Sequence, residues 1–173
     1  ELATELAAIT HPPLAVVGLG FGPDGARAVP RGFGALVCGG EKLALLGCQW
    51  DSAIFDGRAP REHALVRCMY GGVLAPQAAL RSDDELVATA RADLRALLGI
   101  EAAPAFTRVA RWERAIPQYD MGHRERRARI EGAVERSFGL YLCGNATSGV
   151  AFARAGFSGL LAGEKAARGL AQR

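Results

Sequence analysis

The C-terminal part of the chain contains the residue pattern with the clearest chemical potential. An apolar run over residues 140–143 leads into Gly144-Asn145, a loop of small residues and then a helical segment. The glycines of this helix, three and four residues apart and therefore on one face, are Gly156, Gly159 and Gly163. A strand, a glycine turn and a helix N-terminus can hold anionic or electron-rich groups, because free backbone N–H groups and the helix dipole point there. The pattern fits a cofactor edge and tight helix packing equally well.

No other group of residues forms a catalytic constellation by motif. His11, His63 and His123 are far apart, and no G-x-S-x-G sequence occurs. The four cysteines have no C-x-x-C spacing and lie in apolar, strand-like runs; they are Cys38, Cys48, Cys68 and Cys143. We therefore expect small buried thiols, with no disulfide and no metal site, and we assign no catalytic residue.

Composition and charge argue against a nucleic-acid-binding protein and against a membrane-spanning one. Half of the 173 residues are hydrophobic and the formal net charge is +3, with basic and acidic residues mixed along the chain. This distribution argues against nucleic-acid binding. No apolar run approaches the ~20 residues that span a bilayer, so any membrane contact is expected to be peripheral. Because the chain opens at Glu1 in what reads as internal sequence, we expect a fragment.

Hydrophobic periodicity predicts an α+β fold with a mixed, largely antiparallel sheet and flanking helices. Ser82 and Glu85 form a capping box that opens a helix ending at Gly99. Gly18-x-Gly20-x-Gly22 reads as a strand and turn rather than a dinucleotide fingerprint, because Pro-Asp-Gly follows it. Strands are expected near 14–19, 33–38, 43–50, 63–70 and 106–112, and helices near 1–9, 83–98 and 124–136, before the terminal strand, loop and helix.

The chain resembles the amine oxidase superfamily of flavoproteins and, within it, the protoporphyrinogen oxidase family. The resemblance begins in the C-terminal segment and continues upstream in family order along nearly the whole chain. The matching stretches are VGLG (17–20), GFGALV (32–37), LG (46–47), WDS (50–52), Phe55, RAP (58–60), GG (71–72), Trp112, IPQY (116–119) and GH (122–123).

This resemblance implies FAD as the cofactor, which carries the redox chemistry while the protein positions it. Val150, Ala151 and Phe152 match the segment that lies along the flavin, where the helix N-terminus favours negative charge on the reduced ring. The turn near the ribityl and phosphate portion matches Gly144 and Asn145, although many relatives have an acid at the second position. Trp112 matches an aromatic position near the flavin. Core packing is the alternative for these apolar residues.

For the substrate, the resemblance implies a porphyrinogen pocket with one wall on neighbouring strands. The residues that align with this wall are Phe33, Leu36, Gln49 and Tyr70. A large, mostly apolar tetrapyrrole suits such a wall. Gln49 and Tyr70 stand where relatives often have apolar residues, which leaves the identity of the substrate open.

The implied parent protein is an FAD-dependent, oxygen-using protoporphyrinogen oxidase of haem biosynthesis, which oxidises a porphyrinogen to its porphyrin. Residues 1–123 resemble part of its substrate-binding domain, and 124–173 the return segment that completes a Rossmann-like FAD domain. We expect this fragment alone to be inactive and to bind FAD weakly or not at all. The alternatives are a coproporphyrinogen-oxidising relative and a non-enzymatic module that binds a tetrapyrrole or a partner.

The expected location of the parent protein is cytoplasmic and peripheral to the inner membrane, through regions outside this chain. The porphyrinogen is the expected partner, with self-association as a homo-oligomer through the flavin-side surface.

Overall fold

The computed structural model describes residues 1–171, and the chain divides into two compact units. The sheet unit comprises Pro12–Glu113. The helical unit combines Glu1–His11 with the stretch that begins at Arg114. The boundary predicted between residues 123 and 124 separates a substrate-binding region from an FAD-binding region. It does not coincide with the boundaries of these compact units, and it stays a prediction.

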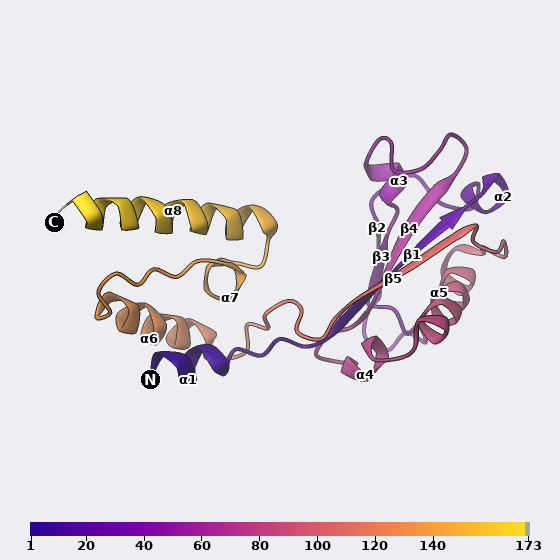
Figure 1. Ribbon diagram of the computed structural model, residues 1–173. Helices are drawn as coiled ribbons and strands as arrows, with labels where there is room; N and C mark the ends of the chain where they lie inside the picture. The colour runs from indigo at the N-terminus through magenta and orange to yellow at the C-terminus, as the bar shows by residue number, and fades with distance from the viewer. Residues whose placement is uncertain (172–173) are drawn as a thin grey trace. The chain divides into compact units, whose positions relative to one another are not determined.

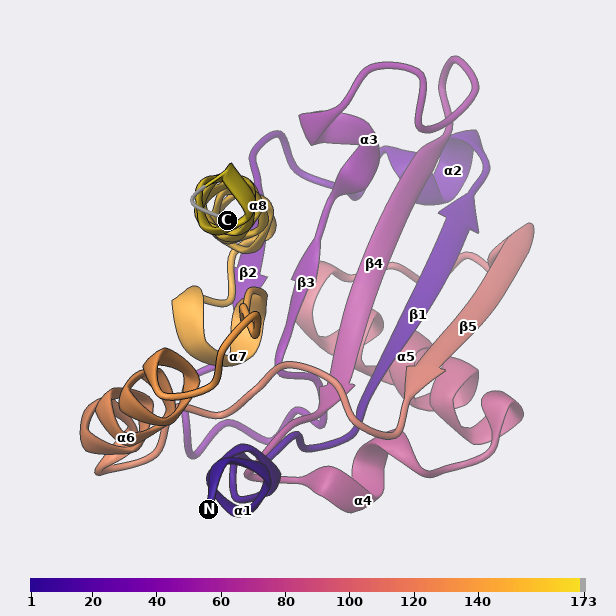
Figure 2. The same ribbon diagram turned by 60° about the vertical axis from the view of Figure 1, so that its left-hand side comes forward.

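The sheet unit is built on one five-stranded antiparallel sheet with the order β2-β3-β4-β1-β5 (Figures 1 and 2). Its strands are β1 (Leu14–Phe21), β2 (Gly34–Leu36), β3 (Gly47–Gln49), β4 (Ala64–Gly71) and β5 (Phe106–Trp112). All four neighbouring pairs are antiparallel: β2-β3 and β3-β4 are consecutive in the chain, whereas β1 pairs with the later strands β4 and β5. The predicted α+β fold is confirmed.

Helix α5 (Asp83–Leu98) covers one face of the sheet, as Figure 2 shows. The Ser82 hydroxyl accepts a hydrogen bond from the Glu85 amide, and the Glu85 carboxylate accepts one from the Ser82 amide, which confirms the capping box. Gly99 ends the helix in the left-handed conformation, with φ of 69°. The helix packs Leu86, Ala90 and Leu94 into the core, where each is fully buried.

The two faces of the sheet differ because successive side chains on a strand point to opposite sides. On β1, the residues from Ala15 to Phe21 at every second position are buried against α5. The alternate residues, from Leu14 to Gly20, are half-buried and belong to the opposite face, here called the open face. The register of β4 and β5 extends both faces across the sheet.

Three one-turn helices connect the strands: α2 (Pro23–Ala26), α3 (Asp51–Ile54) and α4 (Pro76–Ala79). The turn predicted after Gly22 is therefore one helical turn, with proline at its first position where no amide donor is needed. A dinucleotide-binding βαβ unit is still not formed, because β1 has only antiparallel neighbours.

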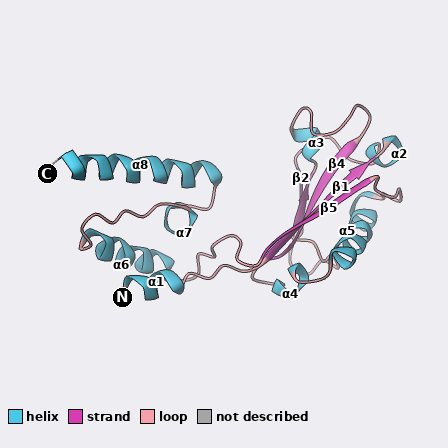
Figure 3. Cartoon of the chain, viewed as in Figure 1, coloured by secondary structure: helices cyan, strands magenta, loops and turns pink. Residues whose placement is uncertain are grey.

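The helical unit contains α1 (Leu2–Ala7), α6 (His123–Glu135), α7 (Asn145–Ser148) and α8 (Phe152–Ala171), drawn in cyan in Figure 3. Glu5 of α1 joins α6 through its carboxylate, which accepts hydrogen bonds from Arg129 at 2.6 Å and from Arg126 at 3.1 Å. On α6, Arg127 Nε donates to Glu131 Oε1, one helical turn further along, at 2.7 Å.

Two local predictions were wrong. Residues 140–143 are not a strand, because no neighbouring strand in the described residues offers them a hydrogen-bond ladder. The expectation of four buried cysteines holds for Cys48 and Cys68, whereas Cys38 and Cys143 are exposed. Both exposed thiols lie outside regular strands, where the alternation that buries a side chain is lost.

None of the helices within residues 1–171 combines the length and the hydropathy needed to cross a bilayer.

Candidate functional site

The register of the open face brings together three of the residues predicted for the site. Gly47 lies opposite both Leu36 and Met69, and Met69 lies opposite Val16. Because directly opposed residues share a face, Leu36 and Gln49 are on the open face. Trp112 is on the same face at the end of β5, opposite Leu14.

Phe33 lies just outside this register, directly before β2. Its carbonyl accepts a hydrogen bond from the Trp50 amide at 3.1 Å, which extends the pairing of β2 and β3 by one step. Its side chain is 65% exposed, and Leu36 is 85% exposed. These two apolar side chains are therefore available to a ligand or to a covering segment.

Tyr70 lies on the opposite face of the sheet from Leu36 and Gln49. It opposes Ala15 in the register and is fully buried under α5. Its hydroxyl donates a hydrogen bond to Asp93 Oδ2 at 3.2 Å. Burial, together with the neighbouring Cys68 and Asp93, raises the pKa of Tyr70. In this position the phenol belongs to the core, and a wall role would need it to leave that core.

Asp93 is a buried carboxylate that the sequence pattern did not single out. It accepts hydrogen bonds from the amides of Ala44 at 3.3 Å and Leu45 at 3.1 Å, besides the Tyr70 hydroxyl. These contacts fix the segment before β3 against α5. An acid on the apolar stripe of α5, one residue before Leu94, was the signal that could have revealed this connection.

Gln49 belongs to a polar cluster on the open face. Arg67 Nη2 donates to Gln49 Oε1 at 2.6 Å and to Asp51 Oδ1 at 2.9 Å. Asp51 is largely buried, with 13% of its side chain exposed, while Arg67 is 40% exposed. The predicted wall residue therefore holds an arginine side chain in place at the open face.

The segment predicted to contact the flavin is arranged around Tyr119. Its hydroxyl donates to the Asn145 carbonyl and accepts from the Gly149 amide at 2.9 Å, so it joins both ends of α7. Its ring stacks on His123, with centroids 3.9 Å apart. Tyr119 belongs to the IPQY stretch (116–119), which matches the family but received no role in binding or catalysis from the sequence.

Glycine geometry shapes the same segment. Gly144 and Gly149 have φ values of 112° and 108°, which side-chain-bearing residues rarely adopt. The Gly144 amide donates to the Ser158 hydroxyl of α8 at 2.9 Å. Asn145 begins α7, directly after this turn.

The start of α8 presents apolar groups to its surroundings. Val150 is 50% exposed and Phe152 95%, and Ala151 between them is exposed as well. A methyl group added at Gly156, Gly159 or Gly163 would meet nothing within 4 Å. Tight packing against another part of the described chain therefore does not account for the glycine stripe.

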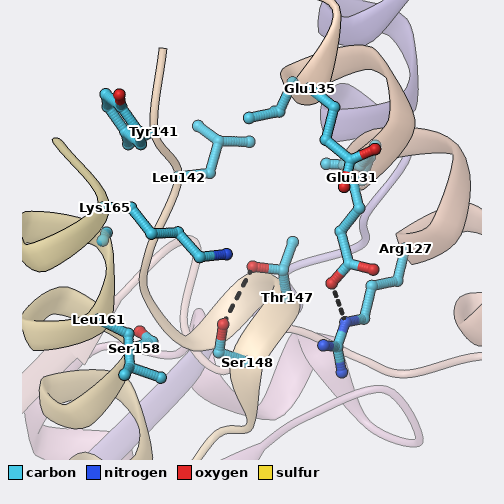
Figure 4. A pocket seen from close by; sticks show the side chains of 13 residues that line it. Arg127, Glu131, Glu135, Tyr141, Leu142, Thr147, Ser148, Ser158, Leu161 and Lys165 are labelled. Carbon is cyan, nitrogen blue, oxygen red and sulfur yellow. Dashed lines mark hydrogen bonds and ion pairs between the residues drawn. The ribbon is translucent and has the colours of Figure 1, made fainter. Parts of the chain in front are cut away.

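A hollow of about 400 Å³ lies between α6, α7 and α8 (Figure 4). Its polar lining includes the Arg127 and Glu131 pair, Lys165 and the hydroxyls of Thr147 and Ser148. The lining is mixed in charge and has apolar members from α6 and α8, so it suits a packed protein segment as well as a polar ligand.

The chain is similar to a known protein family and to several of its members. A family model described as flavin containing amine oxidoreductase matches residues 5–170. The protoporphyrinogen oxidase 1 of Spinacia oleracea chloroplasts is 32% identical over 162 residues, covering 88% of this chain and 29% of that protein. The coproporphyrinogen III oxidase of Bacillus subtilis is 27% identical over 156 residues, covering 86% of this chain and 33% of that protein.

Solved structures share the fold. A candidate protoporphyrinogen oxidase from Exiguobacterium sp. 255-15 aligns with a TM-score of 0.77 at 22% identity, covering 95% of this chain and 37% of that one. Reduced UDP-galactopyranose mutase aligns with a TM-score of 0.61 at 11% identity, covering 85% and 30%. The chain spans about a third of the length of its curated relatives. Because the family model matches almost the whole sequence, the chain belongs to the flavin containing amine oxidoreductase family.

Proposed function

We propose that this chain supplies the substrate wall and part of the flavin site of an FAD-dependent, oxygen-using porphyrinogen oxidase. The observation that carries the proposal is the shared open face of Leu36, Gln49 and Trp112, three residues that the resemblance assigns to substrate or flavin. Relatives named for protoporphyrinogen and coproporphyrinogen oxidation support the choice of reaction.

The open face suits a flat, largely apolar ring system. One row across the sheet consists of Leu36, Gly47, Met69, Val16 and Ala110, with no charged member. A porphyrinogen macrocycle placed on this row would remove apolar surface of both partners from water. Trp112, opposite Leu14 on the same face, would extend the contact at the β5 edge of the sheet.

The backbone from Gly144 to Phe152 fits FAD. The exposed Val150 and Ala151 offer apolar contact to a flat ring, and Gly144, directly before α7, leaves room at the backbone. The first amides of α8 have no acceptor within the helix and can face negative charge. When bound, FAD would accept hydride from the porphyrinogen and pass the electrons to oxygen, giving peroxide. Gly144, Asn145, Val150, Ala151, Phe152 and Trp112 are its proposed contacts.

The proposed functional boundary lies after residue 123, inside the helical unit, and so differs from the boundaries of the two compact units. In this proposal, residues up to 123 serve the substrate side and residues from 124 complete the FAD domain. We expect the isolated chain to hold FAD weakly, because it spans about a third of the relatives' length. Its G-x-G-x-x-G sequence at residues 20–25 lies at the end of a strand with only antiparallel neighbours, so it does not form the βαβ unit that binds a pyrophosphate. The exposed apolar residues of α8 also support contact with a further protein segment or a second copy.

The experiment that tests this function is a chimera in which the chain replaces the matching third of the Bacillus subtilis coproporphyrinogen III oxidase. The chimera is loaded with FAD and mixed with coproporphyrinogen III or protoporphyrinogen IX in air, and porphyrin fluorescence is followed. We expect fluorescence to rise with at least one substrate. A folded, FAD-loaded chimera that oxidises neither, while the unaltered enzyme works, would contradict the proposal.

A further inference from the structure

We propose that Arg67 and Arg108, on either side of Gly18, form a carboxylate-binding subsite on the open face. The inference rests on the proposed function, because it assigns the two arginines to the carboxylate side chains of the tetrapyrrole. It also gives a role to Gly18 of strand β1, which no dinucleotide fingerprint explains.

The register places both arginines beside the same glycine. Gly18 of the central strand lies opposite Arg67 of β4 on one side and opposite Arg108 of β5 on the other. The two arginine Cα atoms are thus two strand spacings apart, about 10 Å. Directly opposed residues share a face, so both side chains rise from the open face with a side-chain-free position between them.

The floor between the arginines is open. A methyl group added at Gly18 would meet only the Arg108 carbonyl oxygen, at the ordinary contact distance of 3.8 Å. At Gly20, two residues along β1 on the same face, an added methyl group would meet the Phe106 side chain at 3.1 Å, so the uncovered position is Gly18. Packing therefore does not require glycine at position 18, and glycine within a strand weakens the sheet unless something approaches the backbone closely.

The two arginines differ in whether a carboxylate of the protein neutralises them. Arg67 is held by Asp51 and Gln49, and its Nε is buried without a hydrogen-bond acceptor. Arg108 is exposed, and no carboxylate of residues 1–171 pairs with it. The row of Gln49, Arg67, Gly18 and Arg108 contains no acid, and Asp51 balances one of its two positive charges. One positive charge remains for a ligand.

The chemistry of this row suits carboxylates beside an apolar ring. A guanidinium group can donate two parallel hydrogen bonds to one carboxylate. The uncharged row of Val16 and Met69 lies two residues away along the strands, about 7 Å. A macrocycle on that row would reach the arginines with its acidic side chains. A porphyrinogen with four carboxylates, such as coproporphyrinogen, gains more from this subsite than one with two.

The test is a titration of the 173-residue chain with coproporphyrin III and with its tetramethyl ester, followed by quenching of tryptophan fluorescence. We expect Arg108→Gln to weaken binding of the acid about tenfold, the equivalent of one charge-assisted contact, and to leave the ester unchanged. Arg27→Gln, which removes an exposed charge directly after α2 in the same unit, should change neither.

A second variant tests the subsite without changing either arginine, in case Arg108→Gln disturbs the fold. Gly18→Val places a strand-favouring side chain on the open floor, so the melting temperature should not fall. Binding of both the acid and the ester should fall by tenfold or more. Equal binding of the acid by Arg108→Gln and the unaltered chain, or an equal loss with Arg27→Gln, would overturn the subsite. Failure of the unaltered chain to bind either compound would instead contradict the porphyrin-binding function itself.

Discussion

Asp93 is the residue on which the link between α5 and the sheet depends most. Its buried carboxylate accepts from two backbone amides and from the Tyr70 hydroxyl. An unsatisfied buried donor destabilises the folded state by ~1–3 kcal/mol, so several at once matter for a domain of this size. The same contact fixes the segment leading into β3, from which Gln49 reaches the open face.

Replacing this carboxylate should destabilise the sheet unit. We expect Asp93→Ala to lower the free energy of unfolding by about 3 kcal/mol, and Tyr70→Phe by about 1 kcal/mol, in urea titrations followed by circular dichroism. Asp56→Ala, at an exposed loop position, is the control and should change little. Equal stability of Asp93→Ala and the control would show that these contacts contribute nothing.

In the helical unit, Tyr119 connects distant parts of the chain as Asp93 does in the sheet unit. We expect Tyr119→Phe to keep the stacking on His123 but to free both ends of α7. Amide hydrogen exchange at Gly149 should then be about tenfold faster, since one hydrogen bond is lost. Tyr141→Phe, a tyrosine beside the hollow of Figure 4, serves as the control. Unchanged exchange at Gly149 would show that the segment keeps its conformation without the hydroxyl.

At the scale of elements, α1 is attached to α6 by charge as well as by packing. The hydrogen bond from Arg129, reinforced by the charges of Arg129 and Arg126, lowers the pKa of Glu5 below its ordinary value. A carboxyl whose folded-state pKa is lowered stabilises the fold above its unfolded pKa. That contribution is lost as the pH falls through the lowered value.

This attachment should therefore weaken in acid. We expect hydrogen exchange in α1 to speed up between about pH 5 and pH 3, after correction for intrinsic rates, and Glu5→Gln to remove most of that dependence. Glu1→Gln is the matched control, because Glu1 is mostly exposed and lies 3.6 Å from Arg136. An unchanged acid response in Glu5→Gln would exclude Glu5 as its source.

Elements with strong local signals were predictable from sequence. The capping box and Gly99 define both ends of α5, and the alternation of β1 follows from its apolar positions. The supposed strand at 140–143 was not predictable, because a strand depends on a partner as much as on its own residues. Strand β4 has apolar residues on both faces, so its alternation does not show which face is buried. The charge of Arg67 is the one sequence signal that positions 65, 67 and 69 lie on the open face. Tyr70 then belongs to the opposite, buried face.

The candidate site was predictable only in part, because it also depends on contacts between residues that are distant in sequence. Resemblance selects positions such as Gln49 and Val150, but it does not give the contacts that hold them. The bond of Gln49 to Arg67 and the role of Tyr119 at α7 join residues distant in sequence, which no local pattern encodes. How these positions bind flavin and substrate stays a prediction.

At the scale of the whole molecule, α8 leaves a large apolar surface in water. Phe152, Phe157, Leu160 and Leu170 are each more than half exposed, and no residue of this helix is buried. Large exposed apolar surfaces are uncommon on monomeric proteins and often mark contact sites. We expect the isolated chain to self-associate through α8.

Polar substitutions on this helix should reduce that association. Phe157→Ser combined with Leu160→Ser is expected to weaken self-association at least tenfold in sedimentation equilibrium, since both side chains lose apolar contact area. Glu164→Ser, on the same helix, should leave it unchanged. A chain that stays monomeric at all concentrations, with or without these substitutions, would contradict an α8 interface.

The proposed function is tested most directly by electron transfer to the flavin in the chimera with the Bacillus subtilis enzyme. With oxygen excluded, coproporphyrinogen III or protoporphyrinogen IX is added stepwise and the visible absorption band of the bound flavin is followed. The proposal predicts that the band bleaches with one of these substrates and returns when air is admitted. A flavin that stays oxidised in a folded chimera, under conditions in which the unaltered enzyme is reduced, would contradict a role for this chain in porphyrinogen oxidation.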